Sequence, residues 1–313
     1  MARNKFAKVR FRKFVRMVFP ALTILIVGFA GILGYLVYRV TRPGAAQETV
    51  NPSHFLLPWL DVTWTTNSGD EMSGWYVVGM KDAPGILLAP GYGMSRSDAM
   101  SLVASLHGAG YHVLVYTQRG FSASRRRASS LGLHEKEDMD SAVAFLKLRP
   151  GIDAGHMGIW GVDEGARAAL AVAASHPEVR AIAADVPYEY VLDLLTLKIR
   201  EELGFGNSLI EGGCRILFRF WQIGSFRDLT EPLPVQALAD RSILFIQGAN
   251  RMEMAPLTVS LYDRVQPQKD MISLPSSRSS VMTSEEVKDY DSQISNFFRA
   301  NLAIVGGVAP TGN

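Results

Sequence analysis

An acidic residue stands at the centre of the segment "MGIWGVDEGARAAL" (157–170), which has the pattern of a strand, a sharp turn and a helix start. Gly161 and Gly165 bracket the turn, with Asp163 and Glu164 between them. A carboxylate at such a turn can act as a nucleophile, forming an ester that base-activated water then hydrolyses. It can equally be structural, because the dipole and free N–H groups of a helix N-terminus favour a negative charge. The residues leave both interpretations open.

The elements that must position this turn follow from the alternation of apolar runs and helical patterns. A hairpin pattern comes first, with "NSGD" (67–70) as its turn. Further strands are expected at the apolar runs 85–90, 112–117, 157–161, 181–187, 242–248 and 270–275. Helical patterns occupy 96–109, 134–148, 164–175, 256–264 and 284–300. This alternation predicts an α/β fold, a doubly wound, mainly parallel sheet covered on both faces. Sites in such sheets lie at the carboxyl ends of the strands.

Five segments, in their order and spacing, resemble the α/β-hydrolase family, closest to its serine aminopeptidase-like and lysophospholipase-like branch. They are "ILLAPGYGMSR", "VYTQRGFSAS", "GLHEKED", "IWGVDEGARAAL" and "SILFIQGANRMEMAP". The resemblance covers about residues 59 to 303. It implies a sheet of the α/β-hydrolase type and an activity on esters, amides or lipids. Its mechanism uses a nucleophile, an acid, a histidine and two backbone donors.

The resemblance assigns the triad positions to residues of unexpected types. The nucleophile position holds Asp163, and the acid position holds Arg251. The histidine position falls at Arg278 or Ser279, and no histidine follows residue 176. All three positions are therefore altered. Because triad members act as a unit, most of the family's rate advantage should be lost.

The oxyanion hole is also affected. By resemblance its donors are the backbone N–H groups of Tyr92 and Glu164. The carboxylates of Asp163 and Glu164 would place negative charge beside it, where a developing oxyanion needs preorganised donors. We therefore expect this site to repel the oxyanion rather than stabilise it.

These substitutions favour a catalytically degenerate hydrolase fold, a pseudoenzyme whose pocket binds a ligand or whose surface binds a partner. The alternative is an active hydrolase of esters, amides or lipids that uses Asp163 as nucleophile or general base, with His134 or Glu253 assisting. Asp185 stands at another acid position used in the fold, but no histidine is available for it to orient. A purely structural membrane protein is a third alternative.

The altered positions suggest a contact of their own. If Arg251 occupies the acid position and Asp163 the elbow, the two side chains can approach each other across the site, and Arg278 can join them. This hypothesis predicts a closed, charge-paired site.

The N-terminus predicts a membrane anchor. Residues 17–38 carry no charge, and a helix of this length spans about 33 Å, close to the ~30 Å hydrocarbon core of a bilayer. Residues 1–16 contain seven basic and no acidic residues. The positive-inside tendency then places the N-terminus in the cytoplasm and the main domain on the extracytoplasmic side. Cleavage as a signal peptide remains an alternative.

The predicted organisation has five parts. They are a basic cytoplasmic arm (1–16), one transmembrane helix (17–40), a linker (41–53), an α/β-hydrolase-like domain (54–303) and a flexible tail (304–313). Residues from about 188 to 238 break the alternation with two helical patterns, which predicts a helical lid inserted over the sheet.

Composition excludes several classes of partner. Outside the basic arm the chain has 25 basic and 30 acidic residues, so no nucleic-acid footprint is expected. The single cysteine, Cys214, cannot form an internal disulfide and is expected to be a small buried hydrophobe. The chain lacks metal-ligand clusters, a phosphate loop and a dinucleotide fingerprint, so we infer no cofactor and no metal. The expected partners are membrane lipid along residues 17–40 and a small-molecule or lipid ligand in the degenerate pocket.

Overall fold

The computed structural model describes residues 2–44, 47–119, 128–225, 229–266, 269–277 and 282–304, with side chains from residue 16 onward except that of Ile223. Its strands are β1 (Trp59–Thr65), β2 (Glu71–Val77), β3 (Ala83–Ala89), β4 (His112–Tyr116), β5 (Ile152–Val162), β6 (Val179–Asp185), β7 (Ser242–Gly248) and β8 (Lys269–Leu274). Its α-helices are α1 (Ala2–Thr41), α2 (Met100–Gly108), α3 (Glu135–Lys147), α4 (Glu164–Ala173), α5 (Val191–Leu203), α6 (Ser208–Trp221), α7 (Ala255–Arg264) and α8 (Ser284–Asn301).

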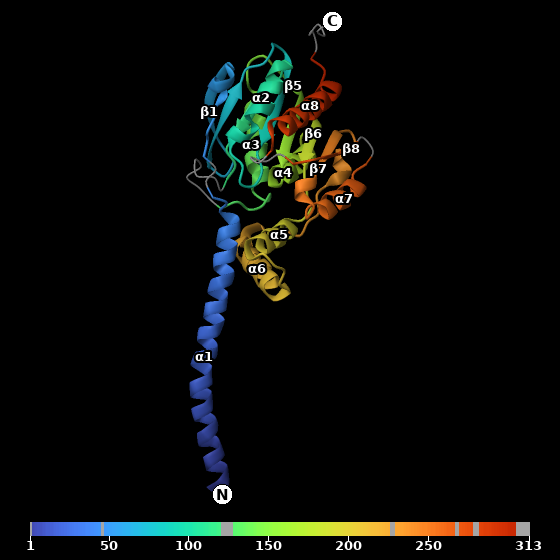
Figure 1. The fold of residues 1–313 in the computed structure, drawn as a ribbon. Coiled ribbons are helices and arrows are strands. Elements are labelled where there is room, and N and C mark those ends of the chain that lie inside the picture. Colours follow the sequence, from blue (N-terminus) through green and yellow to red (C-terminus); the bar gives the residue numbers. More distant parts are fainter. Residues whose placement is uncertain are drawn as a thin grey trace.

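The strands form one eight-stranded sheet in the order β1-β2-β4-β3-β5-β6-β7-β8. The expected hairpin of β1 and β2 is antiparallel, and β2 pairs antiparallel with β4. All later pairings, from β4 with β3 to β7 with β8, are parallel. The predicted fold class, a mainly parallel α/β sheet, is therefore confirmed (Figure 1).

Two apolar clusters cover the two faces of the sheet. Neighbouring residues of β3 point to opposite faces, so that Leu88 joins one cluster and Leu87 the other. Helices α2 and α8 pack with the first cluster, and α3, α4 and α7 pack with the second. Burial on both faces explains why these strands are continuous apolar runs rather than alternating ones.

The predicted lid corresponds to helices α5 and α6, which lie between β6 and β7 in the chain. They lie below the sheet and beside the upper end of α1 (Figure 1). Helix α6 begins at a side-chain cap, because Asn207 accepts hydrogen bonds from the N–H groups of Leu209 and Ile210. Helix α5 ends at Gly204, whose positive φ of 76° suits a residue without a Cβ.

Helix α1 is longer than the predicted span, because it also includes the backbone of the basic arm from Ala2 onward. Its stretch Arg16–Thr41 is long and apolar enough to cross a membrane, as a membrane anchor or a signal sequence is. Most of it projects away from the domain (Figure 1), but Leu33, Val37 and Val40 are buried against it. The end of the helix is thus part of the folded domain.

Candidate active site

The turn between β5 and α4 is sharp, and its apex is Asp163. This residue has φ 50° and ψ −117°, a conformation that costs a non-glycine residue about 1–3 kcal/mol. The close turn depends on the two bracketing glycines. A Cβ at Gly161 would lie 2.4 Å from the carbonyl carbon of Gly165, and a Cβ at Gly165 would lie 2.6 Å from the Ala89 oxygen. The backbone therefore has the strained strand-to-helix geometry that presents a nucleophile in the elbow motif.

The Asp163 carboxylate is bound by Arg251. A short 3-10 helix, Ala249–Arg251, follows β7. The Arg251 guanidinium donates hydrogen bonds to both carboxylate oxygens of Asp163, at 2.9 Å to Oδ1 and 3.3 Å to Oδ2. Asp163 is only 1% exposed, so the pair is largely shielded from water. The predicted ion pair between Asp163 and Arg251 is confirmed.

Arg251 is held from a second side by Glu253, whose Oε1 accepts from Nε at 2.8 Å. Burial acts to lower the pKa of Arg251, but the adjacent Asp163 charge and hydrogen bond, together with Glu253, raise it above its usual value. The guanidinium is therefore a permanent cation. It neutralises the elbow carboxylate and donates a hydrogen bond to each of the two oxygens that a nucleophilic attack could use.

Glu164, the residue after the apex, is in a different electrostatic state. Its side chain is buried, and neither carboxyl oxygen has a hydrogen-bond partner among the residues that the structure describes. Burial and then the neighbouring Asp163 charge raise its pKa well above the usual value. Less negative charge therefore lies beside the expected oxyanion site than the sequence suggests. The Asp163 charge is balanced by Arg251, and burial favours the neutral, protonated form of Glu164.

The turn that carries Tyr92 packs directly against the elbow. A Cβ at Gly91 would lie 2.8 Å from Val162 Cβ, which brings the expected oxyanion-hole segment to the end of β5. The Tyr92 side chain points elsewhere: its hydroxyl donates to the Val40 oxygen of α1 at 2.7 Å, and the Lys198 ammonium lies 4.7 Å from its ring centroid. Tyr92 therefore links the site to α1 and to α5.

His134, considered as a helper of Asp163, and Asp185, considered as another acid position, have other partners. His134 Nε2 lies 3.1 Å from the Gln222 side-chain oxygen, and Asp185 Oδ2 accepts from the Tyr290 hydroxyl at 2.7 Å. None of the six histidines hydrogen-bonds to the Asp163 carboxylate within the part of the chain that the structure describes. Arg278 and Ser279 lie outside the described residues, so the histidine position remains a prediction.

Two of the five segments that resemble the α/β-hydrolase family contact each other beside the elbow. Arg119, from "VYTQRGFSAS", donates to both carboxylate oxygens of Asp138, from "GLHEKED", with one bond at 2.6 Å and the other shorter. Glu135 of the same motif is buried and accepts from the hydroxyls of Ser129 and Ser130. The motif residues thus brace the loop before α3, a structural role that their spacing alone did not reveal.

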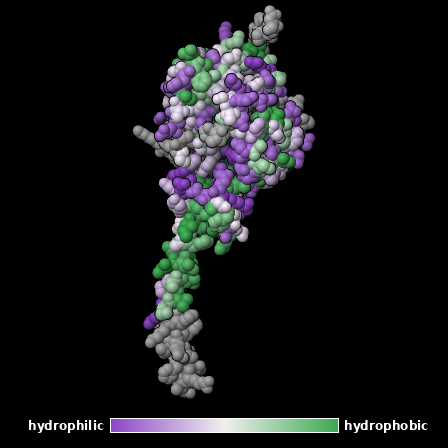
Figure 2. Space-filling model, in the orientation of Figure 1, coloured by the Kyte–Doolittle hydropathy of each residue, from purple (hydrophilic) through white to green (hydrophobic). Residues whose placement is uncertain are grey.

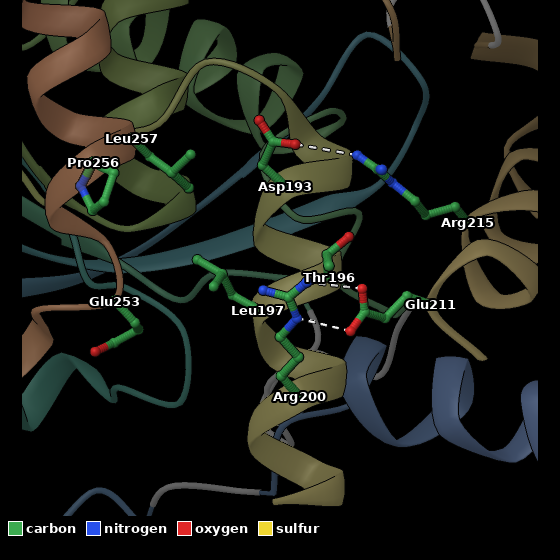
Figure 3. Close-up of a pocket in the computed structure, with 9 residues that line it drawn as sticks. All are labelled: Asp193, Thr196, Leu197, Arg200, Glu211, Arg215, Glu253, Pro256 and Leu257. Carbon is green, nitrogen blue, oxygen red and sulfur yellow. Dashed lines mark hydrogen bonds and ion pairs between the residues drawn. The ribbon is translucent and has the colours of Figure 1, made fainter. Parts of the chain in front are cut away.

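A cleft opens between helices α5 and α6 and the segment that carries Arg251. One part, about 300 Å³, lies between α5, α6 and the start of α7 (Figure 3). In it the Arg200 guanidinium donates to both oxygens of Glu211, at 2.8 and 2.9 Å, and Arg215 donates to Asp193 at 3.2 Å. The adjoining part, about 720 Å³, is lined by residues of α5 and its C-terminal loop together with Asn250, Arg251 and Glu253.

The sequence alone does not mark these residues of α5 and α6 as part of a site. The only signal was the charged run "KIREE" within an otherwise apolar helical pattern, which is also typical of a solvated helix face. No group of three or more metal-ligating side chains stands together among the described residues.

A family model described as "alpha/beta hydrolase fold" matches residues 84–206, which include most of β3, the elbow and all of α5. The chain has the α/β-hydrolase fold. Solved structures agree over most of the chain. An esterase of Pyrococcus furiosus is similar at TM-score 0.63 and 18% identity, over 85% of this chain and 99% of that one. A dienelactone hydrolase of Anabaena variabilis is similar at TM-score 0.55 and 17% identity, over 79% and 99%.

Curated relatives of this α/β-hydrolase-fold chain match it over shorter stretches. A thiohydrolase of Arthrinium phaeospermum is 30% identical over 136 residues, 41% of this chain and 44% of the relative. An uncharacterized protein of Mycobacterium tuberculosis is 29% identical over 163 residues, 50% of this chain and 57% of the relative. The chain thus spans about half the length of the curated relatives that it matches.

Proposed function

We propose that this protein is a membrane-anchored pseudoenzyme of the α/β-hydrolase fold, which binds a ligand in its degenerate site and does not hydrolyse it. The observation that carries the proposal is the two-point ion pair between Arg251 and Asp163. Attack by Asp163 would require its carboxylate to leave a largely dry ion pair with Arg251. The resulting ester would then meet no histidine able to activate water.

The cleft beside the ion pair supports a binding role. Its larger part, about 720 Å³, is in the size range of small-molecule sites, and Arg251 belongs to its wall. The lining combines apolar groups such as Leu197 and Phe205 with the charged groups of Lys198 and Glu201. This mixture suits an amphipathic ligand, one with an acyl chain and a polar head.

Membrane anchoring is proposed from α1. Its apolar stretch Arg16–Thr41 is long enough to cross a membrane. Most of the side chains of this stretch that do not contact the domain are exposed. The preceding basic arm orients the N-terminus to the cytoplasm and the domain to the extracytoplasmic side. Release of the full-length protein from membranes by alkaline carbonate, without detergent, would contradict the anchor.

The second candidate is a live hydrolase that uses Asp163. One observation favours it: the backbone at Asp163 keeps the strained elbow conformation, which a purely structural aspartate does not need. The likeness to thiohydrolases and an esterase then suggests thioesters and esters as substrates.

One assay separates the two candidates. The full-length protein and its Asp163→Asn variant are compared on acyl esters, acyl thioesters, a lysophospholipid, an aminoacyl amide and an epoxide, with thermal unfolding as the control for folding. We expect no turnover by either folded protein. Turnover by the wild type that the variant loses would show a working aspartate and would overturn the pseudoenzyme proposal.

A further inference from the structure

Helix α6 exposes an apolar stripe. Leu209, Ile216 and Phe220 are spaced by seven and four residues, which places them on one side of the helix, and each is more than half exposed. Trp221 at the end of the helix is also half exposed. Large apolar side chains gathered on one helix face usually mark a surface that binds another protein or a membrane.

The stripe adjoins the contact of α6 with the anchor helix. Cys214 Sγ lies 3.9 Å from the Leu33 oxygen of α1, and a Cβ on Gly213 would lie 2.6 Å from Leu33 Cδ1. Figure 2 shows apolar residues gathered at the foot of the domain, where α1 leaves it. The apolar surfaces of the two helices are therefore continuous.

The length of α1 fixes the depth of this contact. The uncharged stretch begins after Arg16, and from Met17 to Leu33 it measures about 25 Å at ~1.5 Å per residue. This is shorter than the ~30 Å hydrocarbon core, so the hydrocarbon must extend about one turn beyond Leu33. Any tilt of α1 shortens its projection further and moves Leu33 deeper.

Groups typical of the membrane interface come directly after this level. Tyr35 and Tyr38 are exposed, and the Arg42 guanidinium stacks over the Tyr38 ring at 4.3 Å. Arg39 pairs with Glu202 of α5 at 3.0 Å. Aromatic and basic residues favour the boundary between headgroups and acyl chains, which places that boundary near residues 35–42 and above Leu33.

We propose that α6 is a second membrane-binding element, with its stripe of Leu209, Ile216 and Phe220 embedded in the acyl region of the leaflet on the domain's side. The inference rests on the membrane anchoring proposed above. Its occupant is bilayer lipid, because the stripe lies at the depth that the anchor assigns to hydrocarbon. The loop after α5, with Phe205, then lets the cleft beside Arg251 open at the membrane surface.

Site-directed spin labels measure the depth directly. The full-length chain, carrying Cys214→Ala, is placed in nanodiscs of phosphatidylcholine and phosphatidylglycerol with one label each at Ile216→Cys, Ile24→Cys or Leu148→Cys. Ile24 reports the anchor, and the exposed Leu148 at the end of α3 reports the aqueous face. We expect collisions with oxygen to exceed those with a nickel chelate at Ile216 and Ile24, and the reverse at Leu148.

Two results would overturn the inference in distinguishable ways. If Ile216 behaves like Leu148 while Ile24 lies in lipid, the anchor stands and only the embedding of α6 is wrong. If Ile24 is also reached by the nickel chelate, the anchor fails and the inference fails with it.

A second measurement keeps Cys214 in place, in case its replacement disturbs folding. Brominated acyl chains quench tryptophan fluorescence within the bilayer. We expect the quenched fraction to fall in Trp221→Phe relative to the wild type, because the other four tryptophans belong to the strands of the domain. An unchanged quenched fraction would contradict the embedding.

Discussion

The Arg251 guanidinium donates one hydrogen bond to each oxygen of the Asp163 carboxylate, at 2.9 and 3.3 Å, although the two residues lie 88 positions apart in the chain. One stands at the apex of the elbow after β5 and the other directly after β7. Because the carboxyl ends of parallel strands share one edge of the sheet, these two loops meet. An ion pair thus joins the two positions that the resemblance assigns to nucleophile and acid.

The ion pair should behave as a coupled unit in a double-mutant cycle. Arg251→Met leaves a buried carboxylate without its cation and should lower the free energy of unfolding by about 3–5 kcal/mol. Asp163→Asn should lower it by about 2–3 kcal/mol, because Arg251 keeps Glu253 as a partner. The double variant should lose less than the sum, with a coupling of about 1–3 kcal/mol in denaturant unfolding.

Glu253→Gln is the matched control for this cycle. Its carboxylate contacts the same guanidinium but is more exposed, so the loss should stay within about 1 kcal/mol. A loss as large as that of Asp163→Asn would mean that Glu253, and not Asp163, is the main partner of Arg251.

Glu164→Gln should stabilise the protein in a pH-dependent manner. Burial raises the pKa of Glu164 in the folded state, so the folded state binds more protons than the unfolded state above the ordinary pKa of about 4.3. The free energy of unfolding therefore falls as the pH rises, by about 1.4 kcal/mol per pH unit, until the pH reaches the pKa of Glu164 in the folded state. The variant lacks this loss.

Thermal unfolding from pH 4 to 8 tests this expectation. The difference in melting temperature between Glu164→Gln and the wild type should be near zero at pH 4 and should grow toward neutral pH. A difference that stays constant with pH would show that Glu164 titrates normally.

Restoring the triad should restore hydrolysis only when all members return together. We expect Asp163→Ser combined with Arg251→Asp and either Arg278→His or Ser279→His to cleave short acyl esters about 10²-fold faster than the uncatalysed background, the contribution of a positioned base, whereas the wild type stays at background. Single variants should remain inactive because triad members act as a unit. Ester hydrolysis by Asp163→Ser alone would contradict the assignment of the other two positions.

Packing of α6 on α1 should control the reactivity of the single cysteine. Burial raises the pKa of the Cys214 thiol to about 11, so its labelling by N-ethylmaleimide should be slow. Gly213→Leu places carbon atoms in the space that Leu33 occupies, and such overpacking should destabilise the contact of α6 with α1 by ~1–3 kcal/mol. The labelling rate of Cys214 should therefore rise about tenfold or more. Gly212→Leu meets open space and is the control, with an expected rate close to that of the wild type.

The sequence by itself determined the order of the elements and the place of the turn. Apolar runs of strand length, helical periodicity and the Gly161–Gly165 spacing are local features, and local sterics and burial act on them directly. The ion pair of Arg251 with Asp163 could be predicted as well, because the order of parallel strands brings the two loops to one edge.

Only the tertiary structure decided the electrostatic state of Glu164 and the packing of α1 on the lid. The sequence assigns Glu164 a negative charge, but its pKa depends on how completely neighbouring segments exclude water. Likewise, the contact of Leu33 with Gly213 joins residues 180 positions apart, and no local pattern specifies it. Desolvation and long-range packing are properties of the assembled fold, since they arise from surfaces that meet only after the chain has folded.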